Sequence, residues 1–199
     1  MPPDRHLRMP HVEAGMTVGL FGGSFNPPHE AHLLIAETAL TRLALDRLWW
    51  MVTPGNPLKQ RSEASLGERV DRSLALTRHP RMDVTALEAS HGVRYTADTI
   101  ALVRARNPGV FFVWIMGADS LADFHRWQRW REIAATVPIA VLDRPGASMA
   151  AMNSVAARSL SAQRVDEADA AGLARMRPPA WTFIHGPRSP LSSTRLRGG

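Results

Sequence analysis

Short runs of apolar residues alternate along this chain with segments in which apolar residues recur at helical spacing. Several of the runs lack the polar alternation of a half-exposed strand, which is typical of strands buried on both faces. Strands are predicted at Thr17–Phe21, Arg47–Thr53, Met82–Glu88, Val110–Gly117, Pro138–Asp143 and Trp181–His185. Helices are predicted between them at Glu30–Leu45, Leu66–Thr77, Ala97–Arg106 and Leu121–Ala135. This alternation predicts an α/β fold, a Rossmann-like doubly wound parallel sheet in a single domain.

Ligands of such sheets bind beyond the carboxyl ends of the strands, where the strand order reverses.

Two parts of the chain fit the alternation of strands and helices less clearly. Residues 1–14 are polar, contain prolines and lack the apolar stretch of a secretory signal, so we expect a flexible tail there and the domain at residues 15–199. Residues 148–177 are rich in alanine, serine and arginine, which fits either one or two helices or a mobile connection. Ser65 and Glu68 predict a capping box before the second helix.

The composition restricts the chemistry more than the fold. The chain has no cysteine, which excludes disulfides, thiolate zinc sites and cysteine nucleophiles. No run approaches the roughly 18 apolar residues of a membrane span, so we expect a cytoplasmic protein without a membrane partner. The net charge of +6 favours anionic partners. Because the arginines are scattered along the chain, small phosphorylated ligands explain this charge as well as nucleic acid does. Lys59 is the single lysine.

The segment after the first predicted strand contains the strongest candidate site. Gly22 and Gly23 allow main-chain N–H groups to approach an anion, and the start of the following helix adds positive dipole character. His29 and His32 lie one helical turn apart, so both could point into the same cleft. The spacing is not that of an H-E-x-x-H zinc helix, and neither a dinucleotide fingerprint nor a Walker lysine follows the glycines. An isolated histidine pair could equally be a cap and a surface residue.

The complete string favours the functional interpretation. Residues 22–32, GGSFNPPHEAH, closely resemble the signature of the nucleotidyltransferase superfamily, G-x-[FST]-[DN]-P-x-H-x-G-H. Ala31 stands where that superfamily usually has glycine. Four further segments resemble the nicotinate-mononucleotide adenylyltransferase family: TPGNPLK at 53–59, RYTADT at 94–99, WIMGADSL at 114–121 followed by FHRW and Trp130, and LSSTRLR at 191–197. The resemblance covers residues 17–197 in the expected order.

The resemblance implies both a reaction and a set of site residues. The reaction transfers the adenylyl group of ATP to nicotinate mononucleotide, giving nicotinate adenine dinucleotide and pyrophosphate in NAD biosynthesis, with Mg²⁺ as cofactor and no metal site built from protein side chains. The implied catalytic residues are His32, His29, Lys59 and Arg197. The implied ATP-binding residues are Gly22, Gly23, Ser24, Phe25, His29, His32, Asp119, Ser193, Thr194 and Arg197. The implied residues for nicotinate mononucleotide are Asn26, Tyr95, Thr96 and Trp127.

Most of these residues also have a purely structural interpretation. Lys59 could simply be solvated, and Thr96 could only be the N-cap of its helix. Trp127 and Trp130 could both be core residues, whereas the resemblance stacks Trp127 on the nicotinate ring. Asp119 could cap the next helix.

Two functional alternatives stay open. One is another nucleotidyltransferase of the same superfamily with a different phosphorylated acceptor. The other is a basic nucleic-acid-binding module, which would require lysine and arginine clustered on one face. The scattered arginines and the glycine-rich first loop disfavour nucleic acid as a partner. The resemblance implies ATP and nicotinate mononucleotide as partners, and a homo-oligomer is possible.

Overall fold

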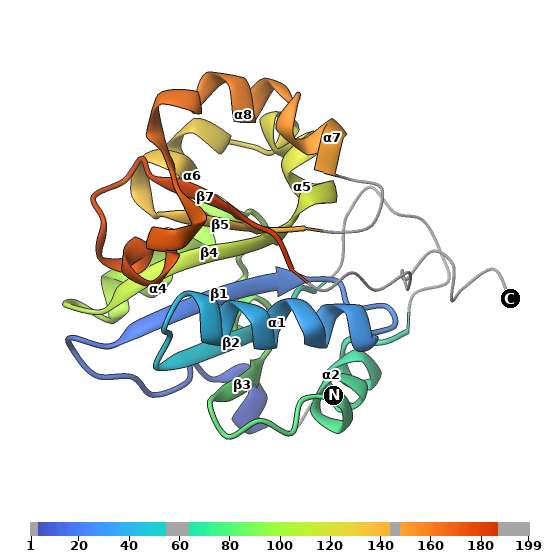
Figure 1. Cartoon of the computed structure of the whole chain (residues 1–199). Helices are drawn as coiled ribbons and strands as arrows, with labels where there is room; N and C mark the ends of the chain where they lie inside the picture. Colours follow the sequence, from blue (N-terminus) through green and yellow to red (C-terminus); the bar gives the residue numbers. More distant parts are fainter. Residues whose placement is uncertain (1–3, 55–63, 144–147, 187–199) are drawn as a thin grey trace, which may run out of the picture.

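The sheet is built from strands that follow one another through helices. A computed structural model describes residues 4–54, 64–143 and 148–186 of the chain (Figure 1). Its strands are β1 (Thr17–Gly23), β2 (Arg47–Val52), β3 (Met82–Thr85), β4 (Phe111–Gly117), β5 (Ile139–Leu142), β6 (Arg164–Val165) and β7 (Trp181–Ile184). Its α-helices are α1 (Glu30–Arg42), α2 (Leu66–Leu76), α3 (Leu87–His91), α4 (Thr96–Arg106), α5 (Ala118–Asp123), α6 (Trp130–Thr136), α7 (Ser148–Met152) and α8 (Val155–Ser159). Its 3-10 helices are η1 (Asp4–Leu7), η2 (Phe124–Arg126), η3 (Ser161–Gln163) and η4 (Glu167–Arg175).

All seven strands of the described part form one parallel sheet in the order β3-β2-β1-β4-β5-β7-β6. The chain moves outward from β1 through β2 to β3 and then returns to place β4 on the other side of β1. The strand order therefore reverses between β1 and β4, the place where parallel sheets bind ligands. This topology confirms the predicted Rossmann-like α/β fold.

Two apolar layers lie on opposite faces of the sheet, and helices cover both (Figure 1). Trp49 and Trp50 show the division, because neighbouring residues of a strand point to opposite faces. Trp49 packs in the cluster that includes residues of α4, α5 and α6, and Trp50 in the cluster that includes residues of α1 and α2. Both side chains are completely buried. This double burial explains why the strands lack polar alternation.

The predicted capping box is confirmed at the start of α2. The main-chain N–H of Glu68 donates to Ser65 Oγ at 3.2 Å, and the main-chain N–H of Ser65 donates to a Glu68 carboxylate oxygen at 2.8 Å. Two main-chain donors at the helix start are thus satisfied locally.

The N-terminal segment, where a flexible tail is predicted, lies in the described structure from residue 4, and several of its residues are bonded to the sheet edge. The ring of His6 is buried, and its Nδ1 lies 3.2 Å from the carbonyl oxygen of Val84 in β3. Thr85 Oγ1 donates to the carbonyl oxygens of His6 and Arg8. The physical reason is that β3 is an edge strand, whose main-chain polar groups need partners that the sequence pattern does not reveal.

The helix predicted at Leu121–Ala135 is wrong as one continuous element. It is divided into α5, η2 and α6, and α5 already begins at Ala118, directly after β4. Arg129 has a φ of 57°, in the left-handed region, which a right-handed helix cannot contain. The break allows Phe124 and Trp130 to be buried together. Residues 148–177 hold α7, α8, η3 and η4 together with the unpredicted short strand β6.

Candidate active site

The candidate site lies at the carboxyl ends of β1 and β4, the two central strands between which the order reverses. Gly22 and Gly23 end β1, and Gly117 ends β4. A Cβ atom on Gly22 would lie 2.8 Å from Cη2 of Trp114, and one on Gly23 would lie 3.0 Å from Cζ of Phe25. The glycines thus make room for two aromatic rings, in addition to the predicted approach of main-chain N–H groups to an anion.

The turn between β1 and α1 is held by an aromatic cluster. Phe25 has a φ of 45°, which costs a residue other than glycine about 1 kcal/mol or more. Its ring is buried, stacks on Trp50 at a centroid distance of 4.4 Å and meets Phe21 edge-on at 5.4 Å. The burial of this ring offsets the cost of its backbone conformation. Phe25, predicted as an ATP-binding residue, is thus buried in the turn and fixes its shape.

His29 and His32 lie side by side at the start of α1, as predicted. Their ring centroids are 3.8 Å apart, and the main-chain N–H of His29 donates to Nδ1 of His32 at 3.3 Å. Because Nδ1 of His32 accepts this bond, a neutral His32 carries its proton on Nε2 and can donate from there to an anion. Phe25 meets the His32 ring edge-on at 5.1 Å. The imidazole is thus fixed in both tautomer and orientation.

Asn26 follows in the same turn, and its peptide bond to Pro27 is cis. Its side chain is 4% exposed, and Nδ2 has no hydrogen-bond partner among the described residues. A buried amide donor without a protein partner is costly in a folded protein. This position fits its predicted role as a ligand-binding residue.

Asp119 stands in the first turn of α5, exposed at the same edge of the sheet. The alternative that it caps this helix is wrong, because the N-cap is Gly117 and no side chain caps the helix there. The structure thus brings a carboxylate to the end of β4, next to the glycine turn that ends β1.

Trp127 and Trp130, which the sequence alone could not divide into core and ligand-binding residues, differ in burial. Trp130 is 8% exposed and belongs to the core, as the structural alternative holds. Trp127 is only partly buried, and its ring meets Trp114 and Phe124 edge-on at 6.3 and 5.4 Å. Trp114 is the same ring that lies against Gly22. A row of aromatic rings therefore extends from the glycine turn, through buried Trp114, to the partly buried Trp127.

Tyr95 and Thr96 lie at the start of α4. The prediction that Thr96 is the N-cap is wrong by one residue: Tyr95 occupies that position, without a side-chain cap, and is 45% exposed. In the first turn of α4, Asp98 accepts a hydrogen bond of 2.5 Å from Arg129, which follows Trp127 by two residues. This ion pair joins the two segments predicted to bind the nicotinate nucleotide.

A buried carboxyl group, that of Glu88, is hydrogen-bonded to the first turn of α4. Glu88 of α3 is 5% exposed, and Thr99 Oγ1 donates to its Oε1 at 2.7 Å. The same hydroxyl lies 3.3 Å from the carbonyl oxygen of Tyr95. Burial raises the pKa of the Glu88 carboxyl above its usual value, and the bond from Thr99 only partly opposes this shift.

We expect Glu88→Gln to flatten the dependence of stability on pH. A carboxyl whose pKa is raised on folding stabilises the protein fully below its unfolded pKa of 4.5, and this contribution is lost as pH rises through the folded value. The variant cannot ionise, so it should gain stability relative to wild type as pH rises above the unfolded value of 4.5. Urea unfolding at several pH values measures this difference, with exposed Glu37→Gln as the control. Parallel profiles for wild type and Glu88→Gln would contradict the assignment.

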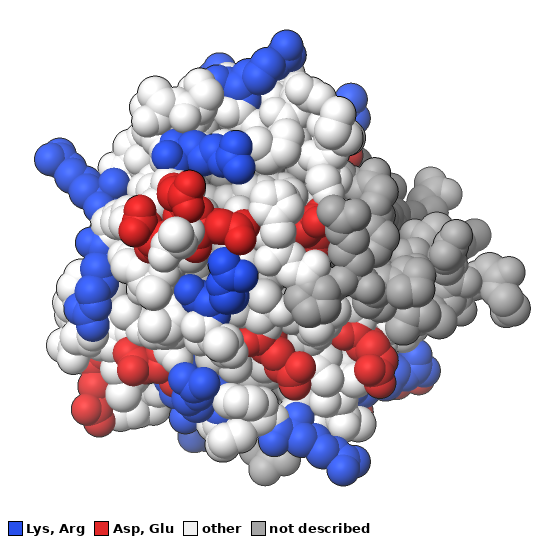
Figure 2. Space-filling view, in the orientation of Figure 1, with Lys and Arg blue, Asp and Glu red and all other residues white. Residues whose placement is uncertain are grey.

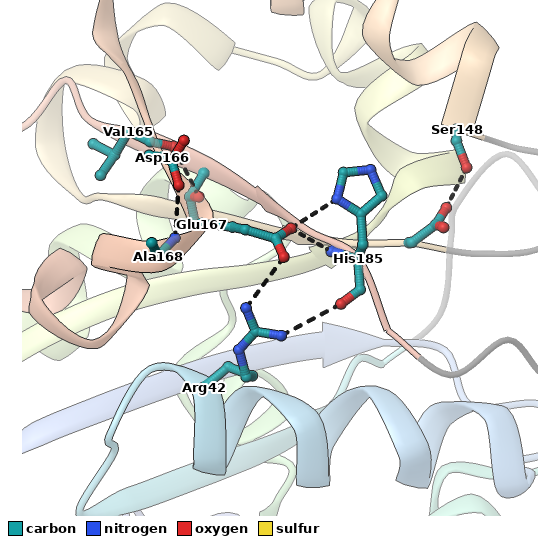
Figure 3. Close-up of polar contacts among 9 residues, drawn as sticks. Arg42, Ser148, Val165, Asp166, Glu167, Ala168 and His185 are labelled. Carbon is teal, nitrogen blue, oxygen red and sulfur yellow. Dashed lines mark hydrogen bonds and ion pairs between the residues drawn. The ribbon is translucent and has the colours of Figure 1, made fainter.

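A second polar network anchors the chain after β7 (Figure 3). Glu167 of η4 accepts hydrogen bonds from the main-chain N–H of His185 at 2.9 Å and from Arg42 at 3.3 Å, and Nδ1 of His185 lies 2.7 Å from its carboxylate. Arg42 also donates to the carbonyl oxygen of His185 at 3.5 Å. The network therefore fastens the end of β7 to α1, the helix that bears His32.

The bond from the His185 main chain, followed by that from its side chain, lowers the pKa of Glu167 to about 2. A lowered carboxyl pKa contributes stability above the unfolded value of 4.5 that is lost as pH falls toward 2. We expect Glu167→Gln to be less stable than wild type at pH 7 and to approach wild type near pH 2. Thermal unfolding across this range, with Glu37→Gln as the control, measures the change. A constant difference from pH 7 to pH 2 would show that the carboxylate charge does not matter.

Several predicted site residues lie outside the described residues, namely Lys59, Ser193, Thr194 and Arg197. Sequence reasoning missed two buried charged residues near the site, Glu88 and Arg69. Arg69 could have been noticed because it shares the buried side of α2 with Val70 and Ser73, where a cation is unusual. Among the helices of the described residues, none is both long enough and apolar enough to cross a bilayer.

Known proteins match this chain over nearly its whole length. The profile of the cytidylyltransferase-like family matches residues 20–199. A protein of Mesorhizobium japonicum is 68% identical over 190 residues, which cover 95% of this chain and 97% of that protein. A protein of Brucella suis biovar 1 is 64% identical over 183 residues, which cover 92% and 94%. Both carry the name "Probable nicotinate-nucleotide adenylyltransferase". This chain belongs to the nicotinate-nucleotide adenylyltransferase family.

Solved structures agree with this family at the level of the fold. Plasmodium falciparum nicotinic acid mononucleotide adenylyltransferase complexed with NaAD superposes with a TM-score of 0.67 at 16% identity, covering 92% of this chain and 83% of that chain. The same enzyme complexed with APC superposes with a TM-score of 0.66 at 15% identity. The predicted family and enzyme class, a nucleotidyltransferase, are therefore confirmed.

Proposed function

We propose that this member of the nicotinate-nucleotide adenylyltransferase family transfers the adenylyl group of ATP to nicotinate mononucleotide. The products are nicotinate adenine dinucleotide and pyrophosphate. The observation that carries the proposal is the paired His29 and His32 beside a glycine turn at the reversal of strand order. A row of aromatic rings adjoins this turn, and its partly buried member, Trp127, can offer a face to a flat heterocycle.

The reaction requires positioning more than proton transfer. An oxygen of the acceptor phosphate forms a bond to the α-phosphorus of ATP as the bond from that phosphorus to the bridging oxygen breaks, and pyrophosphate leaves with the electron pair. The second pKa of a phosphomonoester is near 6, so the attacking phosphate is mostly ionised at neutral pH. No general base is needed, and alignment of the two reactants can supply roughly 7–11 kcal/mol in favourable cases.

The two histidines suit the stabilisation of charge on the ATP phosphates. A neutral His32 offers Nε2–H as a fixed donor, which we assign to the α-phosphate, where negative charge develops. His29 lies against it and we assign it to the same triphosphate. Gly22, Gly23 and Ser24 supply main-chain N–H groups, and Lys59, Ser193, Thr194 and Arg197 are assigned to phosphate oxygens from the sequence alone. Asp119 is assigned to the nucleotide at the end of β4.

Nicotinate mononucleotide, the acceptor, is assigned to the side of the glycine turn opposite to the ATP phosphates. Trp127 would stack on the nicotinate ring, and the start of α4 at Tyr95 and Thr96 would face its carboxylate. Asn26 would donate a hydrogen bond from its buried Nδ2. These assignments keep the acceptor next to the α-phosphate, because Asn26 and His29 belong to the same turn.

Mg²⁺ is the proposed cofactor. Within residues 4–54, 64–143 and 148–186, no group of three or more histidine, cysteine, aspartate or glutamate side chains is gathered to hold a metal ion. Mg²⁺ keeps several waters and takes substrate phosphate oxygens, so we propose that it binds with the ATP phosphates and needs few protein ligands. When bound, the ion would neutralise part of the charge on the phosphates.

Pyrophosphate release measured with ATP and a panel of acceptors tests the proposal. We expect the highest kcat/KM with nicotinate mononucleotide, and lower values with nicotinamide mononucleotide and phosphopantetheine. Equal or greater activity with another phosphorylated acceptor would overturn the proposed specificity in favour of a different transferase of the superfamily.

A nucleic-acid-binding function predicts a continuous basic face. On the face shown in Figure 2, arginines and acidic residues are instead interspersed among the described residues. This mixture supports small phosphorylated partners. Submicromolar binding of duplex DNA at physiological salt would favour the nucleic-acid-binding alternative.

We also propose a cytoplasmic location, because ATP is available there. Fractionation of cells that express the protein tests this location.

A further inference from the structure

A buried arginine lies behind the glycine turn and is not among the residues assigned above. The side chain of Arg69, in α2, is 2% exposed. Its guanidinium group donates to main-chain carbonyl oxygens: Nη1 to Ser24 at 2.7 Å and Thr53 at 2.8 Å, Nη2 to Pro54 at 3.1 Å and Nε to Ala64 at 3.1 Å. The three nitrogens of one planar group thus bind four carbonyls.

These carbonyls belong to segments far apart in the sequence that meet at the site. Ser24 follows the glycines of the turn after β1, and Thr53 follows β2. The main-chain N–H of Thr53 also donates to the carbonyl oxygen of Gly23 at 3.0 Å. Arg69 therefore fixes the turn after β1 relative to the end of β2, with two hydrogen bonds from a single nitrogen.

Only an arginine matches this arrangement. Guanidinium presents its donors in a rigid planar fork, whereas the lysine ammonium is a compact charge on a flexible stem. A buried cation is expensive unless hydrogen bonds compensate it, so the site has to be built around this side chain. The four part-buried carbonyls would lose this donor if the fork were removed, and replacing an internal hydrogen-bond partner in this way is unfavourable.

We propose that Arg69 is a positioning residue for adenylyl transfer, which sets the glycine turn and the end of β2 at the spacing that the triphosphate requires. The inference rests on the proposed function. All four of these bonds go to main-chain carbonyls, so Arg69 acts through the turn. A displacement on the order of 1 Å in reactant alignment can lower a rate by about 10²-fold. Because the same turn continues to His29 and His32, loss of the fork affects the orientation of the ATP phosphates.

The variant Arg69→Lys tests this role, since it keeps the charge and loses the fork. We expect its kcat per folded molecule to fall about 10- to 100-fold. KM for nicotinate mononucleotide should change less, because the nicotinate ring is assigned to Trp127, outside the turn. The control is Arg72→Lys, which changes an exposed arginine on the same helix and should behave as wild type. Circular dichroism and assay temperatures far below Tm ensure that only folded protein is compared. A kcat within twofold of wild type for Arg69→Lys overturns the proposal, because a purely structural or purely charged role would leave kcat intact.

If Arg69→Lys does not fold, the wild-type protein supplies the measurement. The Nη1–H resonances of Arg69, whose nitrogen binds Ser24 and Thr53, should shift when α,β-methylene-ATP binds and shift less when nicotinate mononucleotide binds. An unchanged resonance in the presence of bound ATP analogue overturns the proposal. Wild-type protein that neither binds the analogue nor releases pyrophosphate contradicts the proposed function itself, so the two failures are distinguishable.

Discussion

Replacing His32 with alanine is expected to lower kcat by roughly 10²–10³, the range for losing one preorganised donor to a developing negative charge. The structure gives the reason. His32 Nδ1 accepts a hydrogen bond from the main chain of His29, so the neutral ring keeps a proton on Nε2. KM for ATP should change less than kcat, because this donor matters most in the transition state.

Steady-state rates of pyrophosphate release measure the effect. His79→Ala is the matched control, since His79 lies just before β3, at the amino ends of the strands and away from the site. The histidine pair also packs against Phe25, so unfolding of His32→Ala has to be measured alongside its rate. Near-normal turnover of folded His32→Ala would remove this residue from the mechanism.

Replacing Trp127 with alanine is expected to raise KM for nicotinate mononucleotide about 10- to 100-fold, since aromatic stacking on a base contributes about 1–3 kcal/mol. The ring is partly exposed and is held edge-on by Trp114 and Phe124. KM for ATP should change little. Trp127→Phe should retain part of the affinity because it retains an aromatic face.

Trp130→Ala separates this effect from loss of the core. Trp130 is buried, and truncation of a buried tryptophan costs about 3–5 kcal/mol of stability. We expect Trp130→Ala to lower Tm strongly, and Trp127→Ala to lower it much less. The prediction for Trp127 fails if both variants lose stability equally and the KM for the acceptor is unchanged.

Arg69 stabilises the glycine turn although it lies outside the nucleotidyltransferase signature. The signature covers residues 22–32, whereas Arg69 reaches the turn from α2 through the carbonyl of Ser24. Glu88 has a comparable place beneath the start of α4, through Thr99. In both cases a buried polar side chain orders main chain that is itself assigned to a substrate.

The local sequence pattern was sufficient to predict those features that depend on residues close together in the sequence. The apolar runs predicted the strands because both faces of the sheet are buried, as Trp49 and Trp50 show. Ser65 and Glu68 predicted a capping box because all its atoms lie within one helical turn. The glycines and the histidine pair were adjacent in sequence, so their proximity also followed from spacing.

Contacts between distant segments were decided only by the tertiary structure. The helix predicted at Leu121–Ala135 is broken at Arg129, because burial of Phe124 and Trp130 outweighs helical continuity. Residues near the N-terminus lie against the edge strand β3, where His6 meets the carbonyl oxygen of Val84 and accepts from the main-chain N–H of Ala86, contacts that composition cannot indicate.

The sequence by itself determined the α/β alternation of the main strands and helices, the residue types of the turn after β1 and the family to which the chain belongs. The tertiary structure decided which tryptophan is partly exposed, which carboxyl is buried and which arginine supports the turn. The physical reason is that periodicity and spacing record interactions over a few residues. The burial of Glu88 and the carbonyls around Arg69 depend on segments that meet only when the sheet has formed.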